Sequence, residues 1–390
     1  MKMRIFLVAG EASGDQLGAG VMSALRRRCP DAEFIGVGGV AMAREGLESL
    51  YPLEELAVMG FLPVLRHLPR LLARLRETVA AVLHARPDAL VIIDSPDFTH
   101  RVARRVRQAM PGLPIIDYVS PSVWAWRPGR ARKMRSYVDH VLALLPFEPE
   151  AYRRLGGPSC TYVGHPLIER LADLNASADE LRRREEAPPL FLVLPGSRRA
   201  EIDRLMPIFG RTLIQLVERI GPFESVLPAV PHLEAEIRAK LIGWPVKPRV
   251  ICGEAEKFSA FRCAKAALAA SGTVTLEFAL AEVPMVVAYA VSQVEALARP
   301  FIKVPSIVLP NLILGDNVVP EFLQEKCTPE ALAAALASLF RDGLERKAQT
   351  EAFPHIAERL RLPAGETPSS RAAAIILDSI ATAGGAKEEI

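Results

Sequence analysis

Cysteine is scarce in this chain of 390 residues: there are five, and no two have the Cys-x-x-Cys spacing of a zinc site. Their number is odd and they are scattered, so a disulfide framework is not expected, and reduced thiols of a cytosolic protein are the interpretation. Long apolar runs are also missing. No stretch approaches the roughly 20 residues that span a bilayer, so any membrane contact is expected to be peripheral.

The chain also lacks a strong net charge, because 48 Lys and Arg residues oppose 45 Asp and Glu residues. This balance gives no reason to expect a nucleic-acid partner. Hydrophobic residues make up 50% of the chain and charged residues 24%, which excludes a disordered protein. A length of 390 residues favours two domains over one.

Short apolar runs alternate with stretches of helical character through both halves of the chain. This pattern predicts an α/β fold with two Rossmann-like domains, each built on a parallel sheet buried on both faces. We expect an N-terminal domain at 1–165, a linker at 166–189, a C-terminal domain at 190–362, and a helix and tail at 363–390. Strands are expected at 5–9, 34–37, 89–93, 114–119, 138–145, 190–194, 223–230, 249–252, 266–270 and 284–290.

The turn after the first expected strand contains Glu11, Ser13 and Asp15 and is rich in glycine. Two carboxylates would oppose a pyrophosphate at this place, so NAD is rejected as a cofactor. Carboxylates do accept hydrogen bonds from sugar hydroxyls, which suits a sugar acceptor. The alternative is that Asp15 only caps the following helix.

Asp94 ends the strand expected at 89–93, and Asp97 follows three residues later. Ligands of open α/β sheets bind at the carboxyl ends of the strands, where a carboxylate can act as a general base. A strand-end aspartate that only caps the next helix is the alternative. The Asp-x-x-Asp spacing is not an Asp-x-Asp metal signature, and no catalytic metal is predicted.

Two of the three tryptophans of the chain, Trp124 and Trp126, are separated by a single residue. Indole rings stack on sugar faces, so both are candidates for the acceptor site. They are equally suited to filling a gap between layers of the fold.

The segment 59–76 is both apolar and basic. Its arginines recur four residues apart, on a stripe separate from the leucines, as in helices that lie at a membrane surface. An ordinary surface helix is the alternative. The residues predicted to face the membrane are Phe61, Leu62, Leu65, Arg66, Arg70 and Arg74.

Two turns in the second half predict a site for a diphosphate. In the first, Ser197 and Arg198 follow an apolar strand, and an arginine fork suits phosphate oxygens. In the second, Ser271, Gly272 and Thr273 offer hydroxyl and N–H groups, and Glu277 can accept from ribose hydroxyls. Capping of the two helices without any ligand is the alternative.

Motifs spread from about residue 4 to 340 resemble those of the lipid-A-disaccharide synthases, in the same order. They are Gly10-Glu-Ala-Ser-Gly-Asp, Glu55-Leu-Ala-Val-Met-Gly, Ile93-Asp-Ser-Pro-Asp-Phe, Tyr118-Val-Ser-Pro-Ser-Val-Trp-Ala-Trp-Arg, Leu145-Pro-Phe-Glu, Val163-Gly-His-Pro, Leu194-Pro-Gly-Ser-Arg, Ala270-Ser-Gly-Thr and Leu309-Pro-Asn-Leu.

The resemblance implies a glycosyltransferase of the B type, with two domains facing across a cleft and neither metal nor cofactor. Such an enzyme condenses UDP-2,3-diacylglucosamine with 2,3-diacylglucosamine 1-phosphate, with inversion, and yields UDP and the β-1,6-linked disaccharide 1-phosphate of lipid A. Asp94 matches the family's general base. Arg198, Ser271, Gly272, Thr273 and Glu277 match its UDP-binding turns, and Asn311 matches a polar residue facing the cleft. Together with Ser197 of the first turn, they are the predicted donor-binding residues.

The resemblance also implies a cytoplasmic enzyme, peripheral to the inner membrane, whose members can exchange C-terminal segments in a dimer. Two places depart from the family's pattern, because many relatives carry a basic residue after the position of Tyr289 and at that of Asp316. The competing functions are another UDP-sugar glycosyltransferase, a UDP-sugar epimerase, and a UDP-sugar-binding protein without activity.

Overall fold

The computed structural model describes residues 3–56, 61–291 and 304–388, and for 61–67 and 385–388 it describes the backbone alone. The chain forms two compact units. The first comprises Met1–Pro166 and Leu362–Ile390, and the second comprises Leu167–Arg361. The last helix therefore belongs to the core of the first unit, although it follows the second unit in the sequence.

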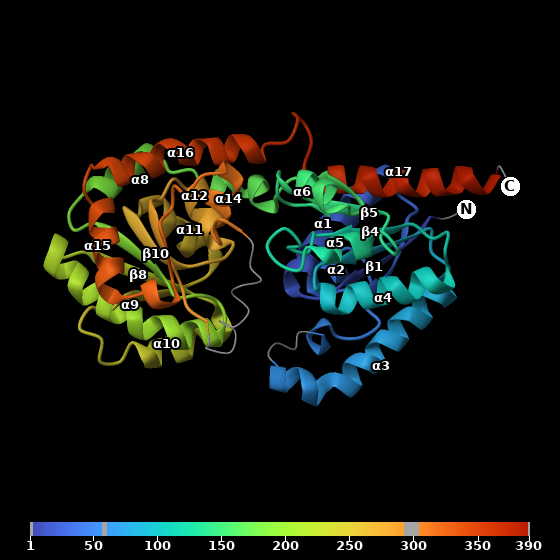
Figure 1. Ribbon diagram of the computed structural model, residues 1–390, viewed down its shortest axis with the longest axis horizontal. Coiled ribbons are helices and arrows are strands. Elements are labelled where there is room, and N and C mark those ends of the chain that lie inside the picture. Colours follow the sequence, from blue (N-terminus) through green and yellow to red (C-terminus); the bar gives the residue numbers. More distant parts are fainter. Residues whose placement is uncertain (1–2, 57–60, 292–303, 389–390) are drawn as a thin grey trace. The chain divides into compact units, whose positions relative to one another are not determined.

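The first unit is built on a six-stranded sheet in the order β2-β1-β3-β4-β5-β6, and all its neighbouring strands are parallel (Figure 1). The strand order reverses between β1 and β3, so the carboxyl ends of these two strands form the crevice where such sheets bind ligands. The strands are β1 Arg4–Ala9, β2 Glu33–Val37, β3 Ala89–Ile93, β4 Ile115–Tyr118, β5 His140–Ala143 and β6 Ser159–Tyr162.

The second unit repeats this plan with the order β12-β11-β10-β7-β8-β9, again with every pair parallel. Here the strand order reverses between β7 and β10. The strands are β7 Leu190–Leu194, β8 Glu224–Ala229, β9 Arg249–Cys252, β10 Ala266–Ala270, β11 Met285–Tyr289 and β12 Glu321–Leu323.

Helices cover both faces of each sheet, which explains why the central strands are apolar along their whole length (Figure 1). In the first unit they are α1 Ala12–Arg28, α2 Val40–Arg44, α3 Phe61–Ala85, α4 Pro96–Ala109, α5 Gly129–Met134, α6 Glu148–Leu155 and α17 Pro368–Glu388. In the second they are α7 Leu171–Leu174, α8 Ala178–Glu185, α9 Arg199–Ile220, α10 Glu234–Lys240, α11 Glu254–Cys263, α12 Val274–Leu280, α14 Leu309–Leu314, α15 Pro329–Leu339 and α16 Leu344–Leu360.

The α/β fold predicted from the sequence is confirmed, and all ten expected strands are present within one or two residues at each end. Two edge strands were not predicted. β6 reads Ser-Cys-Thr-Tyr and β12 has three residues, so neither shows the apolar run by which buried strands are recognised. The stretch expected as a linker, 166–189, contains α7 and α8 and packs within the second unit.

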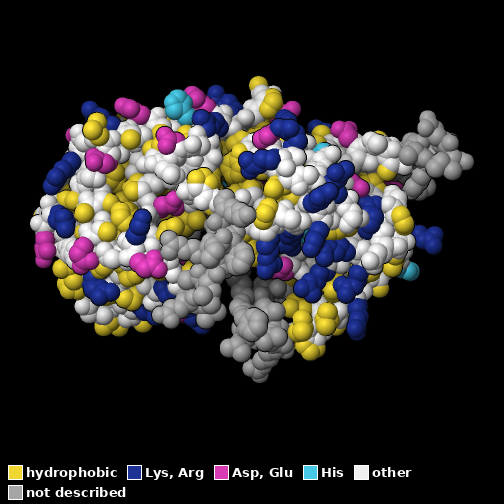
Figure 2. Space-filling model, viewed as in Figure 1, with side chains coloured by type: hydrophobic (Ala, Val, Ile, Leu, Met, Phe, Trp, Pro, Cys, Tyr) yellow, Lys and Arg dark blue, Asp and Glu magenta, His cyan; other side chains and the backbone are white. Residues whose placement is uncertain are grey.

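The C-terminal helix α17 packs against α1, with Ala372, Ala373 and Ile376 fully buried. The exchange of C-terminal segments between subunits stays a prediction. None of the helices in the described part of the chain combines the length and the apolar character needed to cross a bilayer. Lys and Arg side chains gather over the region of α4 and α5 (Figure 2).

Candidate functional site

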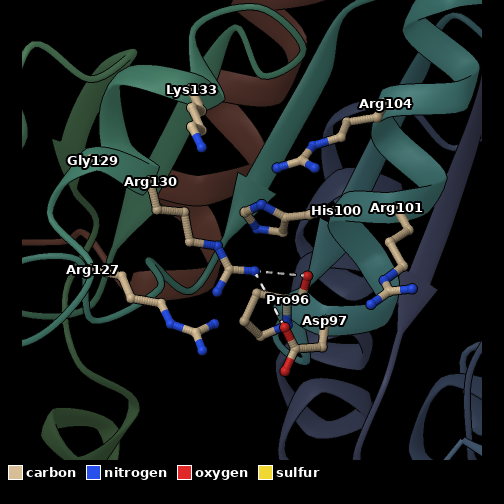
Figure 3. A pocket seen from close by; sticks show the side chains of 9 residues that line it. All are labelled: Pro96, Asp97, His100, Arg101, Arg104, Arg127, Gly129, Arg130 and Lys133. Carbon is tan, nitrogen blue, oxygen red and sulfur yellow. Dashed lines mark hydrogen bonds and ion pairs between the residues drawn. The ribbon is translucent and has the colours of Figure 1, made fainter. Parts of the chain in front are cut away.

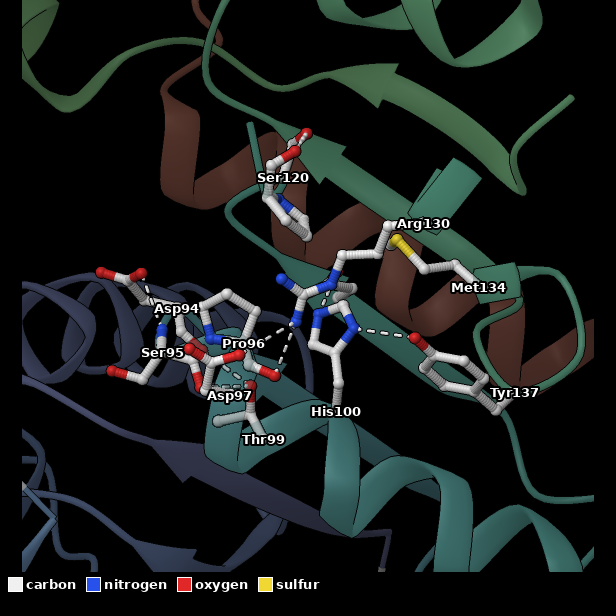
Figure 4. A network of polar contacts seen from close by, with 12 residues as sticks. Asp94, Ser95, Pro96, Asp97, Thr99, His100, Ser120, Arg130, Met134 and Tyr137 are labelled. Atoms are coloured by element: carbon white, nitrogen blue, oxygen red, sulfur yellow. Dashed lines mark hydrogen bonds and ion pairs between the residues drawn. The ribbon is translucent and has the colours of Figure 1, made fainter. Parts of the chain in front are cut away.

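A polar cluster lies where the sheet order of the first unit reverses. Glu11 and Ser13 follow β1, and Asp94 and Ser95 follow β3. Ser13 Oγ donates to Asp94 Oδ2 at 3.0 Å, and Ser95 Oγ donates to Glu11 Oε1 at 3.1 Å. Asp94 Oδ1 also accepts from the Ser95 N–H at 2.7 Å (Figure 4). The fold thus joins two motifs that are more than 80 residues apart.

The backbone at this cluster is held in a rare conformation. Asp94 and Ser95 have φ values of +56° and +43°, in the left-handed region that residues other than glycine seldom adopt. Gly10 faces this turn so closely that a Cβ there would lie 2.2 Å from the Ser95 Cβ. Strain of this kind persists where the surrounding structure enforces it, and it is frequent at functional sites.

Asp15, predicted for the acceptor side, makes several contacts within the protein. Its side chain is buried, and its two carboxylate oxygens accept from the backbone N–H groups of Gly39, Ala41 and Met42 at 2.7 to 3.0 Å. These groups lie at the start of α2, so Asp15 caps a helix 24 to 27 residues away rather than the one that contains it. Three of the about four acceptor positions of this buried carboxylate are thus used within the protein.

The two tryptophans differ in their surroundings. Trp124 packs edge-on against Phe147, with ring centroids 5.0 Å apart, and its Nε1 donates to Glu148 Oε1 at 3.0 Å. Burial raises the pKa of Glu148 to about 7. Trp126 is 42% exposed and the Arg127 guanidinium lies 4.1 Å from its ring centroid, so Trp126 offers more of its ring to a ligand than Trp124 does.

The segment predicted to face the membrane forms the first part of α3. The side chains of Phe61, Leu62, Leu65 and Arg66 lie outside the described part of the structure. Arg70 Nε and Arg74 Nε both donate to Glu55, at 2.8 and 2.7 Å. The hydrogen bond from Arg74 contributes most, and that from Arg70 next, to lowering the pKa of Glu55 to about 2.

Arg74 is therefore held by the protein and does not form part of an unbroken cationic stripe. Its guanidinium also lies 4.7 Å from the centroid of the Tyr51 ring. Arg70 remains half exposed. Of the two predicted arginines whose side chains are described, Arg70 is the more exposed, although it too bonds to Glu55, and the interfacial stripe stays a prediction.

An apolar hollow of about 480 Å³ adjoins the polar cluster. Leucines of α3 form one wall, and Glu11, Ser95 and the first residues of α4 form the other. A ligand with an acyl chain in this hollow would have its polar part beside Glu11 and Ser95. The leucines are Leu68, Leu71, Leu72 and Leu75, with Leu56 from the preceding loop.

In the second unit, the loop after β7 begins α9. Gly196 has a φ of +118°, and a Cβ there would lie 2.4 Å from Glu201 Oε2, so this turn requires glycine. The Ser197 N–H donates to Glu201 Oε2 at 3.3 Å. Arg198 Nη1 lies 3.4 Å from Glu201 Oε1, and the Arg198 side chain is 62% exposed. It can therefore turn toward a ligand, while Glu201 keeps the hydrogen bond from the Ser197 N–H.

The loop after β10, the neighbour of β7, contains the other predicted donor residues. Ser271 Oγ donates to the Ile307 carbonyl at 2.8 Å, so this hydroxyl stabilises the loop itself. The space beside Gly272 is open, with no atom within 4 Å of an added Cβ. Thr273 precedes α12 and is exposed. Glu277 accepts from Lys257 Nζ at 3.0 and 3.1 Å through its two oxygens.

Asn311, predicted as a donor contact, is buried, with 2% of its surface exposed. Its amide donates to the Val319 carbonyl at 2.9 Å and to Ser306 Oγ at 3.2 Å, and its oxygen accepts from the Val319 N–H at 2.8 Å. The side chain fixes the loop between α14 and β12. The structure thus accounts for this residue without a ligand.

Two partners of the site residues were missed by the sequence reasoning. Ser95 was hidden within a motif chosen for its aspartates, although it joins Glu11 to Asp94. Lys257 pairs with Glu277 from a helix 20 residues earlier, and no local pattern indicates such a contact. Among the described residues, no group of three or more His, Cys, Asp or Glu side chains is arranged to hold a metal ion.

Comparison with known proteins gives consistent similarities. A sequence model of the lipid-A-disaccharide synthetase family matches residues 5–375. The lipid-A-disaccharide synthase of Nitrobacter hamburgensis is 58% identical over 97% of this chain and 96% of its own. That of Bradyrhizobium diazoefficiens is 57% identical over 96% of each chain.

Solved structures with the same fold include the glycotransferase of kitacinnamycin, with a TM-score of 0.61 and 17% identity over 96% of this chain and 98% of its own. The UDP-GlcNAc 2-epimerase from Neisseria meningitidis bound to UDP-GlcNAc has a TM-score of 0.58 and 12% identity over 97% and 100%. At these identities the likeness concerns the fold alone. The fold is that of type B glycosyltransferases and of the related epimerases.

Proposed function

Because the chain belongs to the lipid-A-disaccharide synthase family, and so forms the lipid A disaccharide, we propose that Asp94 is the general base of this reaction. The observation that supports this role is the cluster of Asp94 with Ser13, Ser95 and Glu11 at the reversal point of the first sheet. Asp94 takes the proton of the acceptor's 6-hydroxyl as that oxygen attacks the anomeric carbon of the donor. The bond from this carbon to UDP breaks, and its electron pair passes to the β-phosphate.

A product assay tests the function. The purified protein, supplied with UDP-2,3-diacylglucosamine and radiolabelled 2,3-diacylglucosamine 1-phosphate in detergent, should release UDP and form the labelled disaccharide 1-phosphate in equal amounts. An epimerised UDP-sugar without a disaccharide would instead establish the epimerase alternative. Binding of UDP-sugar without any turnover would establish the non-catalytic one.

We propose that the second unit binds the UDP part of the donor at the loops that follow β7 and β10. Arg198 is exposed, lies at the start of a 22-residue helix, and can pair with a phosphate as charge develops on UDP. Open space beside Gly272 permits close approach of a ligand to the backbone. Glu277, already oriented by Lys257, is placed to accept from a ribose hydroxyl.

We further propose that the protein works at the cytoplasmic surface of the inner membrane and contacts it through α3. Leu68 is 39% exposed on this helix, and Arg70 lies two residues away. Residues two positions apart point to different sides of a helix, so this turn offers an apolar side chain and a cation on separate faces, as helices that lie at a membrane surface do. The acyl chains of both substrates would then stay close to lipid.

Replacement of Leu68 and Arg70 together by glutamine should lower sedimentation with anionic phospholipid vesicles several-fold. Arg70 also bonds to Glu55, so Arg74, the less exposed of the two, is left in place to hold that carboxylate in the variant. The matched control replaces Leu181 and Arg182 of α8, which are also an exposed leucine and arginine. Equal sedimentation of the two double variants would show that α3 is an ordinary surface helix and does not contact the membrane.

A further inference from the structure

A second hollow of the first unit, of about 410 Å³, is strongly basic. Arg101 and Arg104 of α4 line one side, and Arg127, Arg130 and Lys133 line the other (Figure 3). The lining contains a single carboxylate, Asp97, and its side chain is 91% exposed. Five cations around one small space repel one another, so a bound anion would stabilise this arrangement.

Three of the arginines are fixed by contacts with the protein. Arg104 Nη2 donates to the Tyr137 hydroxyl at 3.2 Å, and its guanidinium lies 4.7 Å from the Tyr137 ring centroid. Arg130 Nη2 donates to the Pro96 carbonyl at 3.0 Å and lies 3.7 Å from Asp97 (Figure 4). Arg127 stacks on Trp126. Guanidinium groups that are already ordered lose little conformational freedom when they bind an anion.

His100, which lines the hollow, belongs to a buried polar chain. His100 Nδ1 lies 3.1 Å from the Tyr137 hydroxyl, and His100 Nε2 lies 3.1 Å from Asp117 Oδ2, with all three side chains buried. These contacts fix the Tyr137 ring, against which the Arg104 guanidinium packs. The basic hollow is therefore built on buried, mutually bonded residues and is more than a group of surface side chains.

The basic hollow and the apolar hollow share Pro96, Asp97 and Arg101. An amphiphile can therefore place an anionic group in one and an acyl chain in the other. Both hollows flank the start of α4, which begins two residues after Asp94.

We propose that the basic hollow binds a phosphate group, namely the phosphate monoester of the acceptor sugar. A phosphate monoester carries up to two negative charges on three terminal oxygens, and a guanidinium fork can bind these oxygens in pairs. This inference rests on the proposed function, because that function supplies an acylated sugar 1-phosphate as acceptor. The headgroup phosphate of a membrane lipid offers the same chemistry, and the experiment separates these two sources.

The test variant is Arg101→Gln with Lys133→Gln, because both residues are exposed and the contacts of Arg104 and Arg130 remain. The matched control is Arg132→Gln with Arg135→Gln, which removes two exposed cations from α5 and its end without touching the hollow. Equilibrium binding of radiolabelled 2,3-diacylglucosamine 1-phosphate and of its dephosphorylated counterpart is measured in detergent, for both variants and the unaltered protein.

The test variant should bind the phosphorylated probe about tenfold to a hundredfold more weakly, and all three proteins should bind the dephosphorylated probe equally. Sedimentation with anionic vesicles should be equal for the two double variants. Unchanged affinity for the phosphorylated probe, or an equal loss for both probes, would overturn the proposal. A loss confined to vesicle binding would assign the hollow to membrane lipid instead.

The product assay on the unaltered protein separates this result from the proposed function. If that protein forms no disaccharide but still binds the phosphorylated probe through Arg101 and Lys133, the proposed function fails and the phosphate site stands. If it forms the disaccharide and the test variant binds both probes normally, the phosphate site fails and the proposed function stands.

Discussion

Replacement of Asp94 by asparagine should lower the rate of disaccharide formation about a hundredfold or more, since general bases contribute roughly that much or more to catalysis. The affinity for UDP, measured by calorimetry, should stay unchanged, because the proposed donor residues belong to the second unit. The asparagine oxygen can accept from the Ser95 N–H, as Asp94 Oδ1 does, and its amide nitrogen can donate to Ser13 Oγ, but the side chain cannot take a proton from the acceptor hydroxyl.

Asparagine is a more informative substitution at position 94 than alanine, because the backbone there has a positive φ. At a φ of +56° an alanine is strained, whereas asparagine tolerates the left-handed region well. Asp94→Ala would therefore mix the loss of a base with a change of the turn. The two variants should differ in thermal stability, with the alanine variant the less stable.

The matched control for this experiment is Asp88→Asn, at the opposite end of the same strand. Asp88 Oδ2 accepts from the Arg4 N–H at 2.8 Å, a bond that an asparagine oxygen can also accept. This variant should retain its rate. A normal rate in Asp94→Asn would remove Asp94 from the mechanism, and an equal loss in both variants would point to the sheet rather than to the base.

The parts of the fold that the sequence predicted are those with strong local signals. Apolar runs such as Ala89–Ile93 indicate strands buried on both faces, because five residues are too few for a buried helix and polar residues flank the run. Asp94 could be singled out because the carboxyl end of such a strand is where ligands bind. The same reasoning found the loops after β7 and β10.

The contacts that the sequence did not reveal are those of side chains whose partners lie far away in the sequence. Asp15 and Asn311 are polar residues in motifs, and each forms hydrogen bonds with backbone groups of another segment. Arg74 fits an exposed stripe by its spacing, but Glu55 and Tyr51 hold it. Spacing along a helix says which residues share a face, and it cannot say which partner that face will meet.

Replacement of Arg198 by glutamine should weaken the binding of UDP about tenfold to a hundredfold, because a charge-assisted hydrogen bond to a phosphate is lost. The loss has a second cause. Arg198 lies 3.4 Å from Glu201, and without it the carboxylate of Glu201 stands unopposed beside the loop and repels the diphosphate. Calorimetric titration with UDP gives the dissociation constant directly. Arg198→Lys keeps the charge but loses the planar fork, so its affinity for UDP should lie between those of the unaltered protein and of Arg198→Gln.

Arg199 provides the matched control, since it is the next residue and also exposed, but its Nε donates to Glu236 at 2.8 Å. Arg199→Gln removes the same charge from the same helix start, so it should retain nearly the full affinity for UDP if direct pairing with Arg198 matters. If the two variants lose affinity equally, only the overall positive charge of the helix start contributes. If neither loses affinity, Arg198 stabilises the turn and the diphosphate binds elsewhere.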